Sequence, residues 1–267
     1  MITQPRIALP TAPVSANKFI YRSLYFNSES RAFGTNDAPG FTIDPPINTT
    51  EKLKVLAANI PISFYAFDNL TLNVQEATGS LNVSTTLNGN YTNSQLLTAL
   101  GSQLTTASAA TGNTLTYTAT YDSITGKITI TSTGNFTVLS TGTANKNLGF
   151  RNPSAVAGSS QVSDSVVQLT RQYLVIESDE LSQTVATSSR SIYNSDSSRP
   201  IAAVVPITQG VYQYQYYESP EAAEYLSANT SQLERITFRL TDLDGNVVSL
   251  NGLPWSVKLG VFTEGFT

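Results

Sequence analysis

The chain of 267 residues contains neither cysteine nor histidine. Without cysteine there is no disulfide, no thiolate nucleophile and no cysteine-bound zinc. Without histidine there is no Ser–His–Asp triad and no imidazole ligand, and the usual general base near neutral pH is missing. These absences argue against an enzyme and predict no cofactor and no metal site, although carboxylate, lysine or tyrosine catalysis stays open in principle.

Charged residues are also scarce, at 13% of the chain, and the 15 basic residues are outnumbered by 19 acidic ones. No run of basic residues offers the clustered cations that a nucleic-acid binder needs. No stretch approaches the roughly 18 consecutive apolar residues of a membrane span. The hydrophobic fraction of 40% is nevertheless too high for a disordered chain. We therefore expect a folded protein that neither binds nucleic acid directly nor spans a membrane.

Residues 1–18 carry prolines at positions 5, 10 and 13 and lack the continuous apolar stretch of a secretory signal. Proline favours extended backbone, so the segment predicts an extended N-terminal arm. A disordered tail is the alternative.

The pattern of most of the chain predicts β-strands, because branched and aromatic residues alternate with polar ones. Three such segments precede residue 71 and five follow residue 152: FIYRSLYF, FTIDPPI, EKLKVLAANI, QYLVIES, IAAVVPI, VYQYQYYE, ERITFRL and VVSLNGLPWSVKLGVF. Eight antiparallel strands are what a jelly roll requires. The predicted fold is mostly β, with an eight-stranded jelly-roll sandwich built from residues 19–70 and 160–267.

One stretch between these segments, GNYTNSQLLTALGSQL at 89–104, is helical in pattern. Thr92 and Gln95 form a capping-box motif, which satisfies unpaired amides of a first helical turn. One apolar stripe follows at helical spacing, with Gly101 expected on the polar side; its residues are Leu96, Leu97, Leu100 and Leu104. The pattern predicts a helix over about 92–105.

The helix needs a surface on which to bury its leucines, and the next segment supplies one. Residues 114–139 contain two alternating runs joined by a glycine turn, which predicts a β-hairpin. Tyr117, Ala119 and Tyr121 share one face of the first run, and Ile128 and Ile130 share a face of the second. The phrase NLGF at 147–150 adds an apolar pair. We predict a small α+β insertion over residues 71–152.

The tyrosine-rich run VYQYQYYE is the strongest candidate interaction site. Strand alternation places Tyr212, Tyr214 and Tyr216 on one face and Gln213, Gln215 and Tyr217 on the other. Such a stripe can be a core strand with its hydroxyl groups at the rim, a protein interface that includes Tyr217, or a platform on which a ligand stacks.

Two acidic clusters admit a chemical interpretation. In TDLDGN, Asp242, Asp244 and Asn246 are spaced as in a calcium loop, but the glycine and the closing glutamate of that motif are out of place, which favours a plain hairpin turn. In IESDEL, Glu177, Asp179 and Glu180 could pair as in a glycosidase, but a solvated strand end is the favoured interpretation.

Several short phrases, taken in order, resemble a family of capsid proteins. They are AANIPISFYAF, GNYTNSQLLTAL, YDSITGKITIT, NLGF and YLVIES, between about residues 50 and 180, followed more loosely by RLTDLDGN and LNGLPWSV. The set resembles the penton or minor capsid proteins of double-stranded DNA viruses whose major capsid proteins are double jelly rolls. Virophages, polinton-like viruses and large nucleocytoplasmic DNA viruses carry such proteins.

The resemblance implies a structural virion protein that caps the five-fold vertex of an icosahedral capsid. Its expected partners are itself, as a homopentamer, the major capsid protein and a possible host receptor, and its expected location is the capsid vertex after synthesis in the host cytoplasm or a virus factory. A trimeric receptor-binding or adhesin head is the main alternative, and a glycan-active enzyme is a third.

Overall fold

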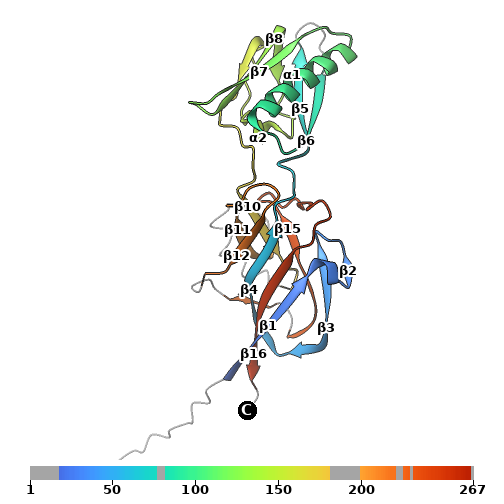
Figure 1. Ribbon diagram of the computed structural model, residues 1–267, viewed down its shortest axis with the longest axis vertical. Coiled ribbons are helices and arrows are strands. Elements are labelled where there is room, and N and C mark those ends of the chain that lie inside the picture. Colours follow the sequence, from blue (N-terminus) through green and yellow to red (C-terminus); the bar gives the residue numbers. More distant parts are fainter. Residues whose placement is uncertain (1–17, 77–81, 181–198, 221–224, 229–230, 266–267) are drawn as a thin grey trace, which may run out of the picture.

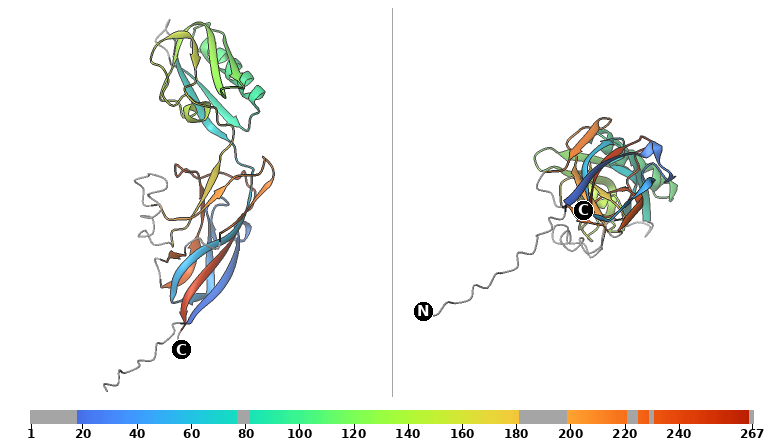
Figure 2. Two further views of the ribbon diagram at one scale, coloured as in Figure 1. Left: turned by 90° about the vertical axis from the view of Figure 1, so that its left-hand side faces the viewer. Right: turned by 90° about the horizontal axis from the view of Figure 1, so that it is seen from below.

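The computed structural model describes residues 18–76, 82–180, 199–220, 225–228 and 231–265. The described chain is mostly β, and it forms two units stacked along the long axis (Figure 1). We call residues 67–169 the α+β unit and the rest the sandwich. The chain crosses between them twice, and the side view shows the narrow connection (Figure 2). The predicted N-terminal arm lies outside the described residues, apart from Lys18.

The sandwich is made of antiparallel sheets. One has the order β1-β16-β4-β12, with β13 also paired to β4, and the facing strands pair as β14-β3-β2 and β11-β10-β15. The strands are β1 (Lys18–Asn27), β2 (Phe33–Gly34), β3 (Pro39–Asn48), β4 (Thr50–Pro61), β10 (Tyr173–Glu177), β11 (Ile201–Pro206), β12 (Tyr214–Glu218), β13 (Leu226–Ser227), β14 (Gln232–Thr237), β15 (Arg239–Thr241) and β16 (Ser256–Gly265), and a short 3-10 helix, η1, spans Ser28–Ser30. The arrangement is jelly-roll-like.

Aromatic side chains join the two layers of the sandwich. Phe26 of β1 lies 4.9 Å from Phe41 of β3 and 5.6 Å from Phe238, between ring centroids. Trp255 packs edge-on against Phe238 at 6.4 Å, and its indole N–H donates to the carbonyl of Asn36. Because these rings come from both sheets, their burial fixes the sheets face to face.

The α+β unit has its own sheet and its own core. Its sheet has the order β6-β5-β8-β7, with β9 also paired to β8. Its elements are β5 (Phe67–Glu76), β6 (Asn82–Gly89), α1 (Asn93–Ala110), β7 (Tyr117–Asp122), β8 (Lys127–Val138), α2 (Asn145–Leu148) and β9 (Gly158–Val162). The sheet therefore takes in residues on both sides of the predicted range 71–152.

The predicted helix and its cap are confirmed. The Thr92 hydroxyl oxygen accepts from the Gln95 amide at 3.3 Å, and the Gln95 side chain accepts from the Thr92 amide at 3.0 Å. The helix runs to Ala110, beyond the expected end, and three of its four predicted leucines are buried in the core of the α+β unit while Leu97 is half-buried.

The prediction that Gly101 lies on the polar side of the helix is wrong. Gly101 is buried, and a Cβ atom there would lie 3.1 Å from the carbonyl oxygen of Tyr117. Thr105 bridges the same contact, because its hydroxyl donates to the Gly101 carbonyl and accepts from the Tyr117 amide. The glycine lets α1 approach β7 closely, a packing demand that the helical pattern does not reveal.

The predicted hairpin is confirmed as the antiparallel pair β7 and β8. Tyr117, Ile128 and Ile130 are buried, and Ala119 and Tyr121 are half-buried against the same core. The two apolar residues of the NLGF phrase, Leu148 and Phe150, join this core. Helix, hairpin and phrase therefore form one packed unit.

Candidate interaction surface and waist pocket

The structure places Tyr214, Tyr216 and Tyr217 on β12, the edge strand of its sheet, whereas Tyr212 lies in the turn before that strand. Tyr212, Tyr214 and Tyr216 are 82%, 55% and 61% exposed, so the core interpretation is wrong for these three. Tyr217 points the other way and packs against the core of the sandwich. Gln215 is buried, and its carbonyl oxygen accepts from the backbone of the preceding loop. The exposed tyrosines are therefore free to act as a contact surface, a role that stays a prediction.

Sequence reasoning missed that β1 extends this aromatic character across the sheet. Tyr21 and Tyr25 are 48% and 70% exposed. Strand register places Tyr25 beside Lys258 of β16, and Tyr216 beside Asn59 of β4, which pairs with Ser256 of β16. Because Ser256 and Lys258 are two residues apart, the tyrosines of β1 and β12 lie on the same outer face. The alternation of Tyr21, Ser23 and Tyr25 was the available signal.

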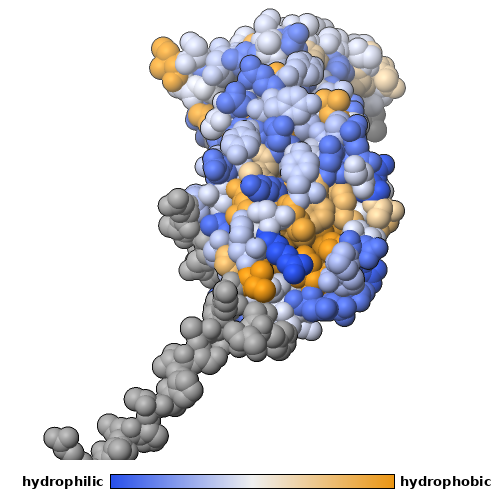
Figure 3. Space-filling view, turned by 60° about the horizontal axis from the view of Figure 1, so that its bottom comes forward, coloured by the Kyte–Doolittle hydropathy of each residue, from blue (hydrophilic) through white to orange (hydrophobic). Residues whose placement is uncertain are grey.

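Rings from three segments cluster at one end of this face. Phe262 of β16 lies 5.2 Å from Tyr21 and 4.2 Å from Tyr225 between ring centroids. Gly260 leaves room for the Tyr21 ring, since a Cβ atom there would lie 3.0 Å from it. Figure 3 shows a separate feature, a group of hydrophobic residues on the sandwich with hydrophilic ones around it; tyrosines do not belong to this group, because they are slightly hydrophilic on the scale of that figure. We call Tyr21, Tyr25, Tyr214, Tyr216, Tyr225 and Phe262 the outer aromatic face.

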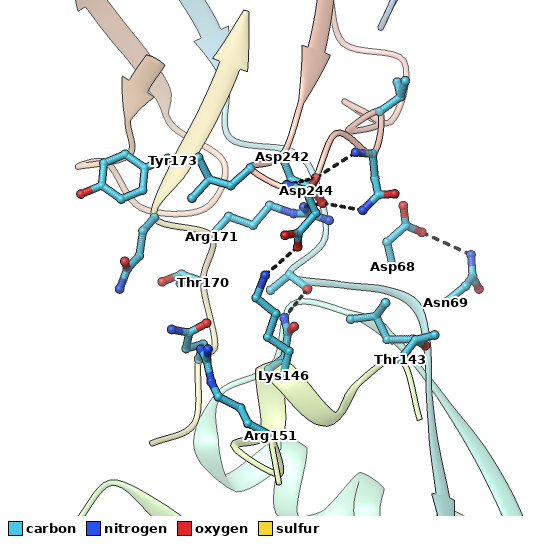
Figure 4. A pocket seen from close by; sticks show the side chains of 18 residues that line it. Asp68, Asn69, Thr143, Lys146, Arg151, Thr170, Arg171, Tyr173, Asp242 and Asp244 are labelled. Carbon is cyan, nitrogen blue, oxygen red and sulfur yellow. Dashed lines mark hydrogen bonds and ion pairs between the residues drawn. The ribbon is translucent and has the colours of Figure 1, made fainter. Parts of the chain in front are cut away.

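A pocket of about 610 Å³ lies at the waist, between the sandwich and the α+β unit. The Lys146 ammonium group of the α+β unit reaches the Asp244 carboxylate of the sandwich at 2.6 Å, and this ion pair crosses the pocket (Figure 4). On the sandwich side, the Arg171 guanidinium pairs with Asp242 at 3.0 Å. Charged residues from both units therefore line the pocket, together with apolar ones such as Leu70 and Leu243.

The turn 241–246 forms the part of the pocket wall that the sandwich contributes beside Arg171. Asp242 accepts hydrogen bonds from the amides of Asp244 and Asn246, both at 2.9 Å, and from the Asn246 side chain. Burial opposes ionisation of Asp242, but the hydrogen bonds from Asn246 and the ion pair with Arg171 outweigh it and hold the pKa of this carboxyl below its usual value. Its oxygens are already engaged, which favours a structural turn over a calcium loop.

The predicted hairpin turn at TDLDGN is confirmed locally, but it does not join two neighbouring strands of one sheet. The turn closes locally through a bridge between Thr241 and Val247. The strands that flank this loop, β15 and β16, belong to different sheets, so the chain crosses the sandwich after the turn.

The prediction of a solvated strand end at IESDEL is wrong for Glu177. Its carboxylate is buried and forms ion pairs with Arg199 and Arg239. Asp179 is exposed and pairs with Arg239 at 2.6 Å. The Arg199 guanidinium also donates to the backbone carbonyls of Asp242 and Leu243, so this cluster connects β10 to the turn 241–246.

Glu76 in the α+β unit is, like Glu177 in the sandwich, a buried carboxyl group. The Tyr117 hydroxyl donates to Glu76 Oε1 at 2.8 Å, and Glu76 Oε2 is buried without a hydrogen-bond partner among the described residues. Burial and the neighbouring Glu76 raise the pKa of Tyr117 well above its usual range. The phenol therefore stays protonated and serves as a buried donor.

Neither metal-binding clusters nor membrane-spanning helices occur in the part of the chain that the structure describes.

No family model matches the chain, and no curated protein matches it. Among solved structures, the chain is similar to the mavirus penton protein, solved with selenomethionine, at 12% sequence identity. The match covers 93% of this chain and 100% of that one, with a TM-score of 0.44. At that score the similarity does not establish the fold, which is read from the strand pairing above.

Proposed function

We propose that this chain is a structural virion protein, a minor capsid or penton subunit that caps the five-fold vertex of an icosahedral capsid. The observation that carries the proposal is the strand order of the sandwich. If β14 and β15, which are separated only by Phe238, are one interrupted strand, the two layers read β1-β16-β4-β12 and β3-β14/β15-β10-β11. Counted in this way, the strand order would be that of an eight-stranded jelly roll, an architecture common in viral capsids.

The position of the α+β unit supports the same function. It lies between β4 and β10 in the chain, at one end of the sandwich, whereas β1 begins and β16 ends at the other (Figure 1). We propose that the α+β unit is an insertion domain that faces outward from the vertex. The end where β1 begins and β16 ends would face the particle interior, where an N-terminal arm could reach a neighbour.

Assembly would use the flanks of the sandwich. A ring of identical subunits closes through heterologous contacts, in which different patches of neighbouring copies meet. The outer aromatic face offers large, rigid side chains of the type enriched at protein interfaces. We propose that this face, with Tyr212 at its border, contacts a second copy or the major capsid protein. The half-buried side chain of Tyr217 packs against the core of the sandwich and so holds β12 in place.

The proposal is tested by the solution mass and its response to the outer aromatic face. Light scattering on a sizing column should give about five chains of 28.7 kDa each. Tyr25→Ser and Tyr216→Ser should shift the equilibrium toward smaller species, whereas Thr120→Ser, on an exposed position of the α+β unit, should leave it unchanged. A trimer would favour the receptor-binding or adhesin head. A stable monomer that does not bind the major capsid protein would exclude a vertex role.

A further inference from the structure

The waist pocket is divided by the ion pair between Lys146 and Asp244. Figure 4 shows Arg151, Thr170, Arg171 and Tyr173 to one side of this pair, and Asp68, Asn69 and Thr143 to the other. The first side, which we call the arginine side, brings the α+β unit and the sandwich together around one concave space. Ligand sites commonly occur at such junctions, and about 610 Å³ lies within their usual size range.

Some charged groups at the arginine side already have ion-pair partners, and one does not. The carboxylates of Asp242 and Asp244 are paired with Arg171 and Lys146. Arg151 is exposed, and its guanidinium group makes no hydrogen bond or ion pair with the residues that the structure describes. Its five donors form a planar fork suited to a carboxylate or a phosphate. An anionic group of a ligand can therefore bind here without displacing an existing partner.

The rest of the arginine side is suited to hydroxyl-bearing molecules. Gln168 and Gln172 contribute amide groups, and Thr170 a hydroxyl group, all in the pocket lining. Tyr173 is 41% exposed and presents part of its ring. Amides and hydroxyls can both donate to and accept from sugar hydroxyls, and an aromatic ring can cover an apolar sugar face. Together with Arg151, this lining has the chemistry of a site for a carboxylated sugar.

We propose that the arginine side of the waist pocket binds an acidic saccharide, with Arg151 holding the sugar carboxylate. Thr170, Gln168 and Gln172 bind its hydroxyl groups, and Tyr173 covers one face of the ring. The site goes beyond a capsid role, and it does not depend on how many copies assemble, because it lies within one chain.

The test is ligand-observed and protein-observed NMR on the full chain with two matched probes. Sialyllactose carries a carboxylated sugar on lactose, so lactose itself is the neutral control. Sialyllactose should bind at least about tenfold more tightly than lactose, as expected for a charge-assisted contact. Equal affinities, or no binding of either probe at millimolar concentration, would overturn the proposal. So would inorganic phosphate competing as well as the sugar, or an acidic peptide competing better.

Variants assign the binding to this pocket. Arg151→Ala should weaken sialyllactose binding at least about tenfold, and Arg151→Lys should weaken it less, because the charge remains without the fork. Arg235→Ala removes an exposed arginine of the sandwich outside the pocket and should change nothing. Equal losses in Arg151→Ala and Arg235→Ala would show that net charge, and not the pocket, attracts the sugar. The oligomer mass, measured on the same samples, reports separately on the capsid proposal.

Discussion

Replacement of Leu100 by alanine should destabilise the α+β unit selectively. Leu100 is fully buried on α1, between the equally buried Leu96 and Leu104, in a core that is separate from that of the sandwich. Removing a buried leucine side chain costs the transfer free energy and leaves a cavity, about 3 kcal/mol in all. With a urea dependence of about 1.5 kcal/mol per molar for a unit of this size, the unfolding midpoint should fall by roughly 2 M.

The chain provides a reporter for each unit. Its single tryptophan, Trp255, is buried in the sandwich, so its fluorescence follows that unit alone. The 18-residue helix α1 lies in the α+β unit, so the helical signal in circular dichroism follows the other. Leu100→Ala should therefore shift the helical transition and leave the tryptophan transition in place.

A matched control lies on the opposite side of the same helix. Thr98 is exposed, and Thr98→Ala should be neutral or slightly stabilising because alanine has the higher helix propensity. If Leu100→Ala shifts both transitions by the same amount, the two units unfold as one, and the proposed division of the chain into a sandwich and an insertion is refuted.

Three further substitutions test particular contacts. Gly101→Ala would stabilise an open helix by about 1 kcal/mol, but here the added methyl group meets the Tyr117 carbonyl, so the helical transition should not rise; a clear gain would show that α1 can move away from β7. Glu177→Gln leaves two arginines without their buried partner and should destabilise the sandwich by about 3 kcal/mol in tryptophan-detected unfolding, whereas a loss below about 1 kcal/mol would mean that the ion pairs contribute little. The folded pKa of Asp242 lies below its unfolded value, so its contribution to stability is present above about pH 4 and is lost as the pH falls through the folded pKa. Asp242→Asn should therefore lower stability at neutral pH and flatten the acid limb of the stability curve, and an unchanged acid limb would contradict the assignment.

The features that the sequence predicted correctly depend on neighbouring residues. The capping box of Thr92 and Gln95 spans one helical turn, and the hairpin alternation needs only two adjacent runs. Local rules of capping and alternation are sufficient for both. The alternating segments were likewise enough to predict a mostly β chain with one helix-bearing unit between its strands.

The features that it missed depend on distant contacts. Gly101 is buried because β7 approaches it, and a helical wheel does not show what packs on its far side. Glu177 is buried where two arginines reach it, Arg239 from β15 and Arg199 from the segment before β11. The waist pocket is lined by residues from four separate segments of the chain, so no single sequence motif could have predicted it.

Tyrosine alternation was ambiguous for a different reason. It fixes which residues share a face but not which face is inward, since tyrosine suits both a core rim and an interface. The structure resolved this through Gln215, which is buried where Tyr214 and Tyr216 are exposed.

The most direct test of the proposed capsid role is the symmetry of the purified assembly, seen in electron-microscopy class averages of the main sizing-column peak. The account predicts rings of five subunits, with the sandwiches side by side and the α+β units projecting at one end. Three-fold averages would contradict a vertex subunit and favour a receptor-binding head.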